Sequence, residues 1–317
     1  MNRQDKFEDL LLMSDPHAVF AEVRYILSLL IADFDDTALN QVFQDVVRLF
    51  KGEYPGYRQC NTWYHDLKHT TDCLLAMARL LHGAALNGLA MPEREVSLGL
   101  IAALLHDTGY LQTADDLEGT GAKYTLVHVP RSVAFMEKYF PQAGFSARDL
   151  DYCRCCINCT GLEVSIGEIA FESEHHQIVG WMLGTADLLG QMADRTYLER
   201  LPFLYREFEE GKVPGFASEL DLLKKTPAFW EFTKQRLIQE LGNVARYMRD
   251  HFRVRWGLDR DLNQETIEGN IAYLEFILEN HESDYRWHLR RSGYMAILNA
   301  RDKIAKEGKK KKLRPYP

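Results

Sequence analysis

The stretch LLHDTGY, residues 104–110, contains an imidazole and a carboxylate side by side, at His106 and Asp107. It closes a run of apolar residues and leads into Gly109. Apolar residues of helical period followed by a glycine predict a helix that ends at this pair. Neighbouring side chains on a helix point in different directions. The two groups therefore either cap a helix end at the surface or both turn toward something placed beyond that end.

Helical periodicity also dominates the rest of the chain and predicts an all-α fold. Asn61 or Thr62 is the expected N-cap of the helix before this stretch, and the polar, glycine-bearing residues 111–123 are expected to form a loop. The predicted helices span residues 16–32, 36–51, 63–81, 92–107, 127–140, 146–159, 175–193, 227–251 and 264–280, with another within 283–306.

Composition limits the class of protein. The chain has 317 residues, of which 46% are hydrophobic and 26% charged, as in ordinary globular proteins. A net charge of -8 argues against general nucleic-acid binding, which favours a basic surface. No apolar run approaches the ~18 residues of a membrane helix, and the first residues lack the apolar core of a signal peptide. We expect a cytoplasmic protein without membrane or nucleic-acid partners, and a homo-oligomer remains open.

Four of the six cysteines crowd into the sequence CRCCINC, at Cys153, Cys155, Cys156 and Cys159. A disulfide framework is not expected in a chain without an export signal. On a helix these thiols would spread over more than one face, which suits a tetrahedral metal site poorly. Reduced thiols packed as small apolar residues are the favoured interpretation, with a structural metal or a redox switch as the alternative.

Further histidines and acids extend the pair at residues 106–107 into a set. His65 and His69 are four residues apart and are predicted to share one face of the helix 63–81. Asp187, in TADLLG, is flanked by apolar residues, and such an acid is costly to bury unless it is paired or binds a metal. Three helices of a bundle can present these side chains to one divalent ion. Nitrogen and carboxylate donors suit Zn, Mn, Fe and Ni and, less well, Mg.

With this set, the sequence resembles the HD-domain metal-dependent phosphohydrolases, an all-helical superfamily named for its adjacent His-Asp pair. LLHDTGY is similar to the central motif of that superfamily, and YHDLKH is similar to the YHNxxH stretch of its cyclic-nucleotide phosphodiesterase branch. The resemblance implies that His69, His106, Asp107 and Asp187 bind a first metal ion and that Asp107 can bridge to a second. It also implies that His65 protonates the leaving oxygen.

The resemblance implies a division of the chain and a reaction. The HD core would span residues 55–200, with N-terminal helices in 1–54 packing on it, a C-terminal helical extension in 201–306 belonging to the same compact unit, and a basic flexible tail in 307–317. The expected reaction is hydrolysis of a phosphomonoester or phosphodiester of a nucleotide-like small molecule by water that one or two divalent ions activate. Two alternatives stay open, a regulatory module that binds metal and nucleotide without turnover and a di-iron oxygenase.

Three more residues are candidates for binding phosphate or a second metal. His128 stands where several HD proteins carry an extra histidine, and a histidine at the end of a loop is the plain alternative. Lys68 and Arg131 would supply positive charge, because two aspartates neutralise one divalent ion and leave none for a phosphate dianion. The pair His175-His176 is interpreted as a polar helix start rather than as metal ligands.

Overall fold

In a computed structural model, the described part of the chain (residues 13–289, 293, 295–300, 302 and 303) is helical, and its only β pairing is an isolated bridge between Tyr57 and Thr113. The prediction of an all-α fold is thus confirmed. The α-helices are α2 (Pro16–Leu30), α3 (Thr37–Lys51), α4 (Leu67–Leu86), α5 (Glu93–Leu105), α6 (His128–Gln142), α7 (Ala147–Asn158), α8 (Glu174–Met192), α9 (Tyr197–Glu210), α10 (Glu219–Gln239), α11 (Tyr247–Trp256), α12 (Leu262–Asn280) and α13 (Tyr285–His288).

Helix α4 lies at the centre of the molecule. It packs against α2, α5, α8 and α11, and its residues are buried almost without interruption from His69 to Ala84. Helix α5 in turn packs against α3, α7 and α8. A helix buried on all sides can hold polar side chains only where partners satisfy them, so polar groups on α4 are informative about function.

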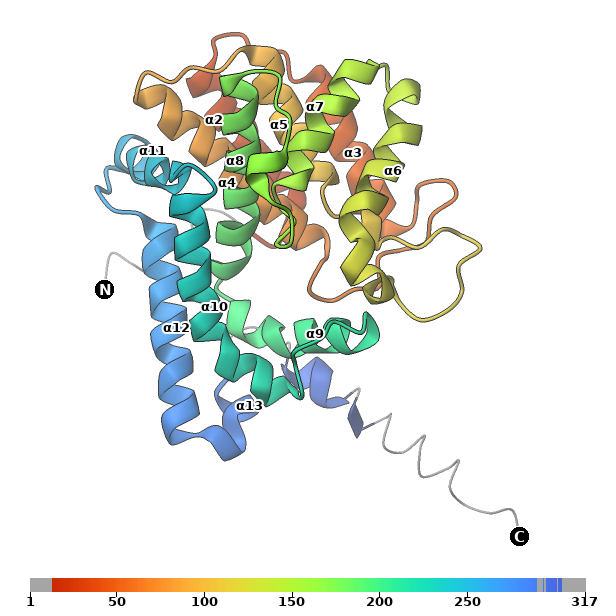
Figure 1. The fold of residues 1–317 in the computed structure, drawn as a ribbon, viewed down its shortest axis with the longest axis vertical. Helices are drawn as coiled ribbons and strands as arrows, with labels where there is room; N and C mark the ends of the chain where they lie inside the picture. The colour runs from red at the N-terminus through yellow and green to blue at the C-terminus, as the bar shows by residue number, and fades with distance from the viewer. Residues whose placement is uncertain (1–12, 290–292, 294, 301, 304–317) are drawn as a thin grey trace.

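Helices α9, α10, α12 and α13 form a second group in the lower part of the view in Figure 1, whereas α11 packs on α4. Helix α10 packs against α9 and α12, and α12 also contacts α8, α11 and α13. This arrangement brings α9 next to the segment that precedes α4, where Glu207 accepts hydrogen bonds from the backbone N–H groups of Trp63 and Tyr64, both at 2.7 Å. The C-terminal helices therefore help to shape the centre of the molecule.

Several helix boundaries differ from the sequence prediction: α4 ends at Leu86 rather than 81, α10 begins at Glu219 rather than 227, and α9 (Tyr197–Glu210) was not among the predicted helices. Two of the differences have a clear local cause. Helix α4 begins at Leu67 rather than Trp63, because the Asp66 carboxylate accepts from the backbone N–H of His69 at 2.9 Å and so acts as the N-cap. The predicted helix 227–251 is two helices, α10 and α11, because Gly242 and Asn243 adopt φ of 58° and 52° and interrupt it.

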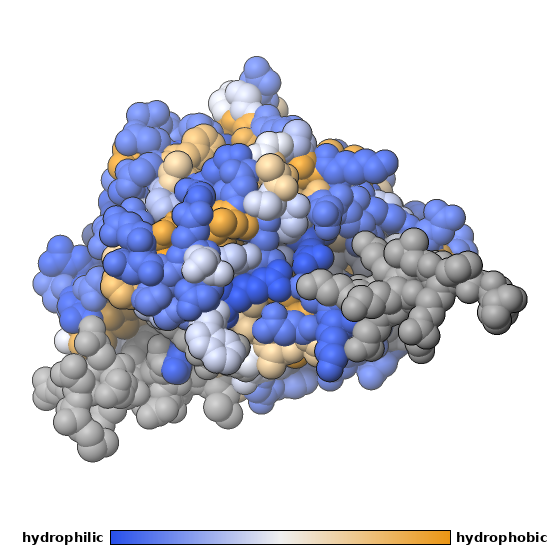
Figure 2. Space-filling view, turned by 90° about the horizontal axis from the view of Figure 1, so that it is seen from below, coloured by the Kyte–Doolittle hydropathy of each residue, from blue (hydrophilic) through white to orange (hydrophobic). Residues whose placement is uncertain are grey.

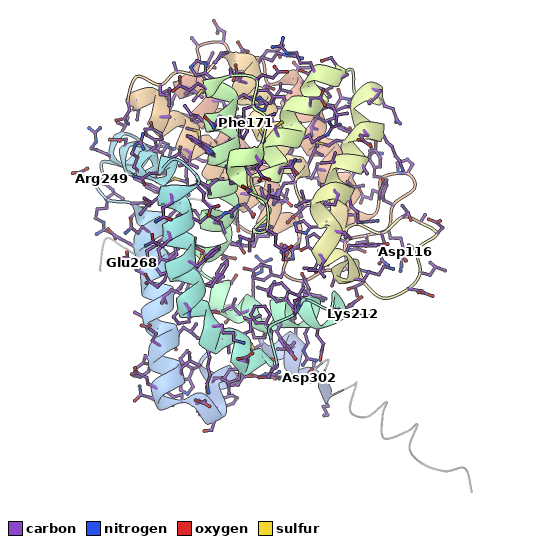
Figure 3. The ribbon with its side chains drawn as sticks, in the orientation of Figure 1. Asp116, Phe171, Lys212, Arg249, Glu268 and Asp302 are labelled. Atoms are coloured by element: carbon purple, nitrogen blue, oxygen red, sulfur yellow. The ribbon has the colours of Figure 1, made fainter. Side chains whose placement is uncertain are left out.

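The remaining segments join these helices through short 3-10 turns. These are η1 (Thr108–Tyr110), η2 (Gly121–Val127), η3 (Ile166–Glu168), η4 (Val244–Arg246) and η5 (Glu282–Asp284). In the loop between η1 and η2, Asp116 accepts hydrogen bonds from Lys123 and Tyr124 (Figure 3). The predicted tail, 307–317, and part of the predicted helix 283–306 lie outside the described residues. In the described part, none of the helices is sufficiently long and apolar to span a membrane.

Candidate metal centre

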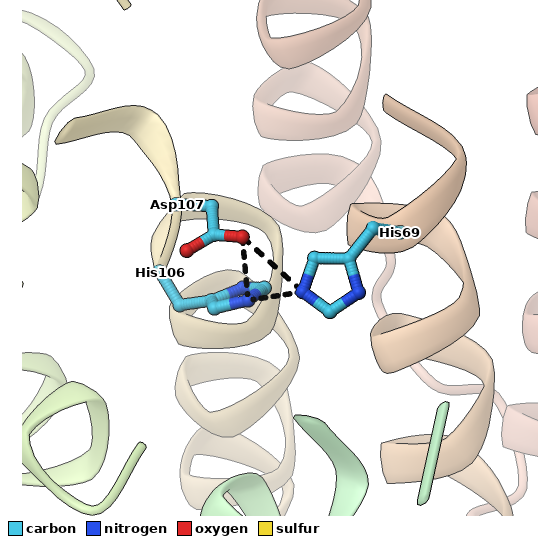
Figure 4. Close-up of side chains that lie close together, drawn as sticks. All are labelled: His69, His106 and Asp107. Atoms are coloured by element: carbon cyan, nitrogen blue, oxygen red, sulfur yellow. Dashed lines mark hydrogen bonds and ion pairs between the residues drawn. The ribbon is translucent and has the colours of Figure 1, made fainter. Parts of the chain in front are cut away.

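Four donor atoms from three helices meet in the buried centre of the molecule. His69 comes from the first turn of α4, His106 and Asp107 follow the last residue of α5, and Asp187 lies in α8. The Nε2 atoms of His69 and His106 are 3.3 Å apart (Figure 4). Asp107 Oδ2 lies 3.2 Å from the first and 3.3 Å from the second, and Asp187 Oδ1 lies 3.1 and 3.6 Å from them.

These separations are those expected around a single cation. Donors that bind one ion with bonds of about 2.0–2.2 Å lie roughly 3.0–3.5 Å from one another. His69, His106 and Asp107 are buried, and one donor atom of each lies within 4.8 Å of the others, so the three could hold a metal ion. Helix α5 ends at Leu105, with His106 as its C-cap, so Asp107 does not have to follow the helical path. The side chains of His106 and Asp107 can therefore both face the same position.

Hydrogen bonding leaves the site rich in acceptors. His106 Nδ1 lies 2.8 Å from the carbonyl oxygen of Ala103, which can only accept, so Nδ1 carries a proton and Nε2 is the ring atom left for a metal. Asp107 Oδ2 is buried and lacks a hydrogen bond within the described part of the chain. A proton on His69 Nε2 can serve only one of the acceptors that face it. A divalent cation would satisfy all of them together.

The charges of this cluster depend on one another. Burial disfavours protonated imidazole, but the two carboxylates outweigh that effect, raising the pKa of His69 to about 9 and the pKa of His106 well above its usual range. Burial likewise acts to raise the pKa of the Asp107 and Asp187 carboxyls, but the imidazoles hold both well below the ordinary value. Without a cation the carboxylates are thus ionised and the imidazoles hold protons near neutral pH, so a metal ion that binds here must displace the imidazole protons.

The second oxygen of Asp107 faces His128. His128 begins α6, and its Nδ1 donates to the carbonyl oxygen of Thr125 at 2.7 Å, which leaves Nε2 as an acceptor. That Nε2 lies 3.8 Å from Asp107 Oδ1, and burial lowers the pKa of His128. Two acceptors that face each other across this gap fit a second cation, with Asp107 between the two positions.

His65 lies in the turn before α4, so the prediction that it shares a helical face with His69 is wrong. Its Nδ1 is 2.7 Å from Glu207 Oε2, and its ring stacks on Tyr110 with centroids 4.3 Å apart. Tyr110 also stacks against His128, with centroids 4.7 Å apart, and the centroids of His65 and His128 are 6.3 Å apart. Glu207 was not foreseen from the sequence, because the acid-rich segment REFEEG gives no sign of which acid turns inward.

Ser132 is a second residue that the sequence did not reveal. Its hydroxyl donates to the carbonyl oxygen of His106 at 2.5 Å and accepts from the N–H of Gly109 at 2.9 Å, so α6 fixes the turn that carries the His-Asp pair.

The two predicted cationic residues are engaged elsewhere. Lys68 Nζ lies 2.5 Å from Asp72 Oδ2 and 3.0 Å from Asp194 Oδ2. Arg131 donates to the carbonyl oxygens of Gly109 and Leu111 at 2.7 and 3.1 Å, and its guanidinium lies over the ring of Tyr124. Lys68 and Arg131 therefore stabilise the neighbouring structure and are not assigned to phosphate binding.

The other singled-out residues lie apart from the four donors. His176 is buried, its ring stacks on Tyr152, and its backbone N–H is capped by Ser173, as expected of a helix start. Cys153, Cys156 and Cys159 are buried free thiols, and Cys155 is partly exposed.

Comparison with known proteins gives one match. Residues 52–250 match the family described as Npun_R2479-like. This range includes all four donors together with His65, His128 and Glu207. No curated protein matches the chain, and no solved structure matches it.

Proposed function

The chain belongs to the Npun_R2479-like family, and we propose from its central site that it is a metal-dependent phosphohydrolase acting on a phosphomonoester or phosphodiester of a nucleotide-like small molecule. One observation carries this proposal: four donor atoms, two imidazole nitrogens and two carboxylate oxygens, converge within 3.1–3.6 Å of their neighbours. The resemblance of LLHDTGY and YHDLKH to the HD phosphohydrolases supports it from the sequence side.

Charge balance favours a second cation. Asp107 and Asp187 neutralise one divalent ion, so that ion alone leaves no positive charge for a phosphate dianion. Lys68 and Arg131 are occupied, as described above. Asp107 Oδ1 and His128 Nε2 lie 3.8 Å apart and are two acceptors that a second cation could share. Divalent ions at these positions would lower the pKa of a water molecule and neutralise phosphate oxygens.

Exposure indicates from which side a substrate reaches the centre. The side chains of His69 and His106 are 2% and 1% exposed, whereas those of Asp187, His65 and His128 are 14%, 15% and 24% exposed. A phosphate ester would therefore approach past His65 and His128. A cavity of about 400 Å³ adjoins Glu207 and Trp63, but none of the four donors lines it, so it is not the reaction site.

We assign the role of general acid to His65. Glu207 Oε2 lies 2.7 Å from its Nδ1 and orients the ring, while Nε2 lies 3.5 Å from Tyr110 Oη. In the reaction, water attacks phosphorus, the bond from phosphorus to the ester oxygen breaks, and the His65 proton passes to that oxygen. The proton that the attacking water loses balances the one that His65 gives up.

The test combines metal analysis with a hydrolase screen. Purified protein would be assayed on p-nitrophenyl phosphate and bis-p-nitrophenyl phosphate with Mn, Zn, Mg, Ni or Fe added. His69→Ala and Asp187→Ala should lose both metal and hydrolysis, whereas His65→Ala should keep its metal and lose about 100- to 10,000-fold in rate. His175→Ala, a histidine outside the cluster, is the control. A metal-loaded protein that consumes oxygen but hydrolyses no phosphate ester would overturn the proposal in favour of an oxygenase, and one that does neither would favour a regulatory module.

A further inference from the structure

A second group of ligating side chains lies at the far end of the C-terminal helices. His281 follows α12, Asp284 ends η5, and His288 ends α13, at the lower end of the molecule in Figure 1. One donor atom of each residue lies within 4.8 Å of the other two. The spacing of three and then four residues brings side chains to one side of a helical path. This group is independent of the function proposed above.

The contacts within this group are those of donors around a shared ion rather than of hydrogen bonds. His288 Nε2 lies 3.4 Å from Asp284 Oδ2, and His281 Nδ1 lies 3.8 Å from Asp284 Oδ1, both longer than the usual 2.7–3.2 Å of a hydrogen bond. The imidazole rings of His281 and His288 stack with centroids 3.8 Å apart. Both rings therefore lie next to the Asp284 carboxylate.

Neighbouring residues fix the turn that carries the group. Tyr273 Oη donates to the carbonyl oxygen of His288 at 3.1 Å, which ties α13 to α12. Arg286, two residues from both Asp284 and His288, pairs with Glu219 of α10 and with Asp302. These carboxylates neutralise its charge.

We propose that His281, Asp284 and His288 bind a transition-metal ion. Two imidazole nitrogens and one carboxylate oxygen suit Zn²⁺, Ni²⁺, Co²⁺ or Cu²⁺ rather than Mg²⁺ or Ca²⁺, which favour oxygen ligands. Three protein ligands leave a further position for water or an external donor. The side chains are 34%, 54% and 26% exposed, so an ion can reach them directly from solvent. The bound ion would link the end of α12 to α13.

The proposed site at His281, Asp284 and His288 is more exposed to solvent than the central site. Figure 2 views the molecule from below, and the described part of this face is largely hydrophilic with separate apolar patches. A partly exposed site on such a face exchanges its ion more readily than the buried centre does. The two sites should therefore separate in a chelator titration, with the C-terminal ion removed first.

Metal counting on the full chain tests the proposal. The protein would be loaded with Zn²⁺ and Ni²⁺ in turn, desalted, and analysed for metal per chain. We expect His281→Ala/His288→Ala to bind one ion fewer than the unaltered protein while hydrolysis and the central metal stay unchanged. An unchanged ion count would overturn the proposal. Asp284→Asn should weaken binding, and Ser283→Ala, beside it, is the matched control.

Fluorescence gives a second measurement that does not depend on the central site. Trp287 is exposed and directly precedes His288. Cu²⁺ bound by this group should quench Trp287 emission in a saturable way in Asp187→Ala protein, and the quenching should vanish in His281→Ala/His288→Ala and in Trp287→Phe. Quenching that persists in the histidine variant would contradict the assignment, as would the absence of saturable quenching in the parent.

Discussion

Glu207 Oε2 lies 2.7 Å from His65 Nδ1, although 142 residues separate the two in the chain. The same carboxylate accepts from the backbone N–H groups of Trp63 and Tyr64 through its other oxygen. Helix α9 therefore sets both the path of the chain before α4 and the orientation of the proposed general acid. The C-terminal helices therefore help to build the surroundings of the candidate metal centre.

This contact predicts the behaviour of Glu207→Gln. The amide oxygen can still accept from the backbone, but His65 loses its carboxylate partner. Hydrolysis should fall by about 10- to 100-fold, as when the hydrogen-bond partner of a functional histidine is removed, while the metal content stays the same. Steady-state rates and metal analysis on the same sample would check this. Glu209→Gln, two residues on, is the control, and full activity in Glu207→Gln would argue against the role given to His65.

Metal removal should destabilise the protein. An ion that binds the folded state alone adds about 2.7 kcal/mol to the free energy of unfolding when its concentration is 100 times the Kd. A chelator should therefore lower the Tm of the unaltered protein, and adding the metal back should restore it. Asp187→Asn, combined with His281→Ala/His288→Ala so that the C-terminal group holds no ion, should be insensitive to both treatments. Urea unfolding with and without chelator measures the difference; equal stability in the two conditions would mean that the four donors do not hold an ion.

The candidate site could be predicted in part from local sequence. His69, His106, Asp107 and Asp187 attract attention because polar side chains interrupt apolar, helical segments, and burying them without a partner is costly. The structure brings these four together. The all-α fold class can also be predicted from the sequence, since apolar residues recur with the 3.6-residue period of a helix along the chain. Periodicity does not locate helix ends, and Asp66 displaces the start of α4 because its carboxylate caps the helix more effectively than the earlier candidates.

The contacts across the molecule could not be predicted in the same way. Glu207 and Ser132 are ordinary helical residues in the sequence, and only the packing of α9 and α6 turns them toward His65 and His106. Lys68 and Arg131 show the converse. A cation close in sequence to the metal ligands suggests phosphate binding. In the structure, however, Lys68 pairs with a buried carboxylate and Arg131 donates to a backbone carbonyl oxygen.

The close approach of α6 to the His-Asp turn makes Gly109 sensitive. A Cβ at this position would come within 1.9 Å of the backbone carbonyl oxygen of His128. Gly109→Ala should therefore push α6 away, lower the free energy of unfolding by about 1–3 kcal/mol, and weaken binding of the second cation. Gly269→Ala is the control, because nothing lies within 4 Å of its Cβ in the exposed middle of α12; that change should raise stability by about 0.5–1 kcal/mol. Similar effects at both positions would contradict the packing described here.

A buried histidine pair away from the metal centre predicts sensitivity to acid. His251 of α11 lies against His82 of α4, with their Nδ1 atoms 3.2 Å apart. Burial, and then the positive charges of Arg79, His82 and Arg255, lower the pKa of His251 to about 2. Between that value and the ordinary pKa of about 6.5, the unfolded chain binds a proton at this residue and the folded chain does not. The contribution of His251 to stability therefore falls as the pH drops below 6.5.

The size of this effect follows from the proton linkage. Between pH 7 and pH 5 the loss attributable to His251 is about 2 kcal/mol. His251→Leu should show a correspondingly smaller difference in the free energy of unfolding between these two pH values, whatever its absolute stability. His17→Leu, at an exposed histidine, should keep the full difference. Urea unfolding at pH 7, 6 and 5 measures these slopes; identical slopes for His251→Leu and the unaltered protein would mean that His251 takes up its proton in the folded state as readily as in the unfolded chain.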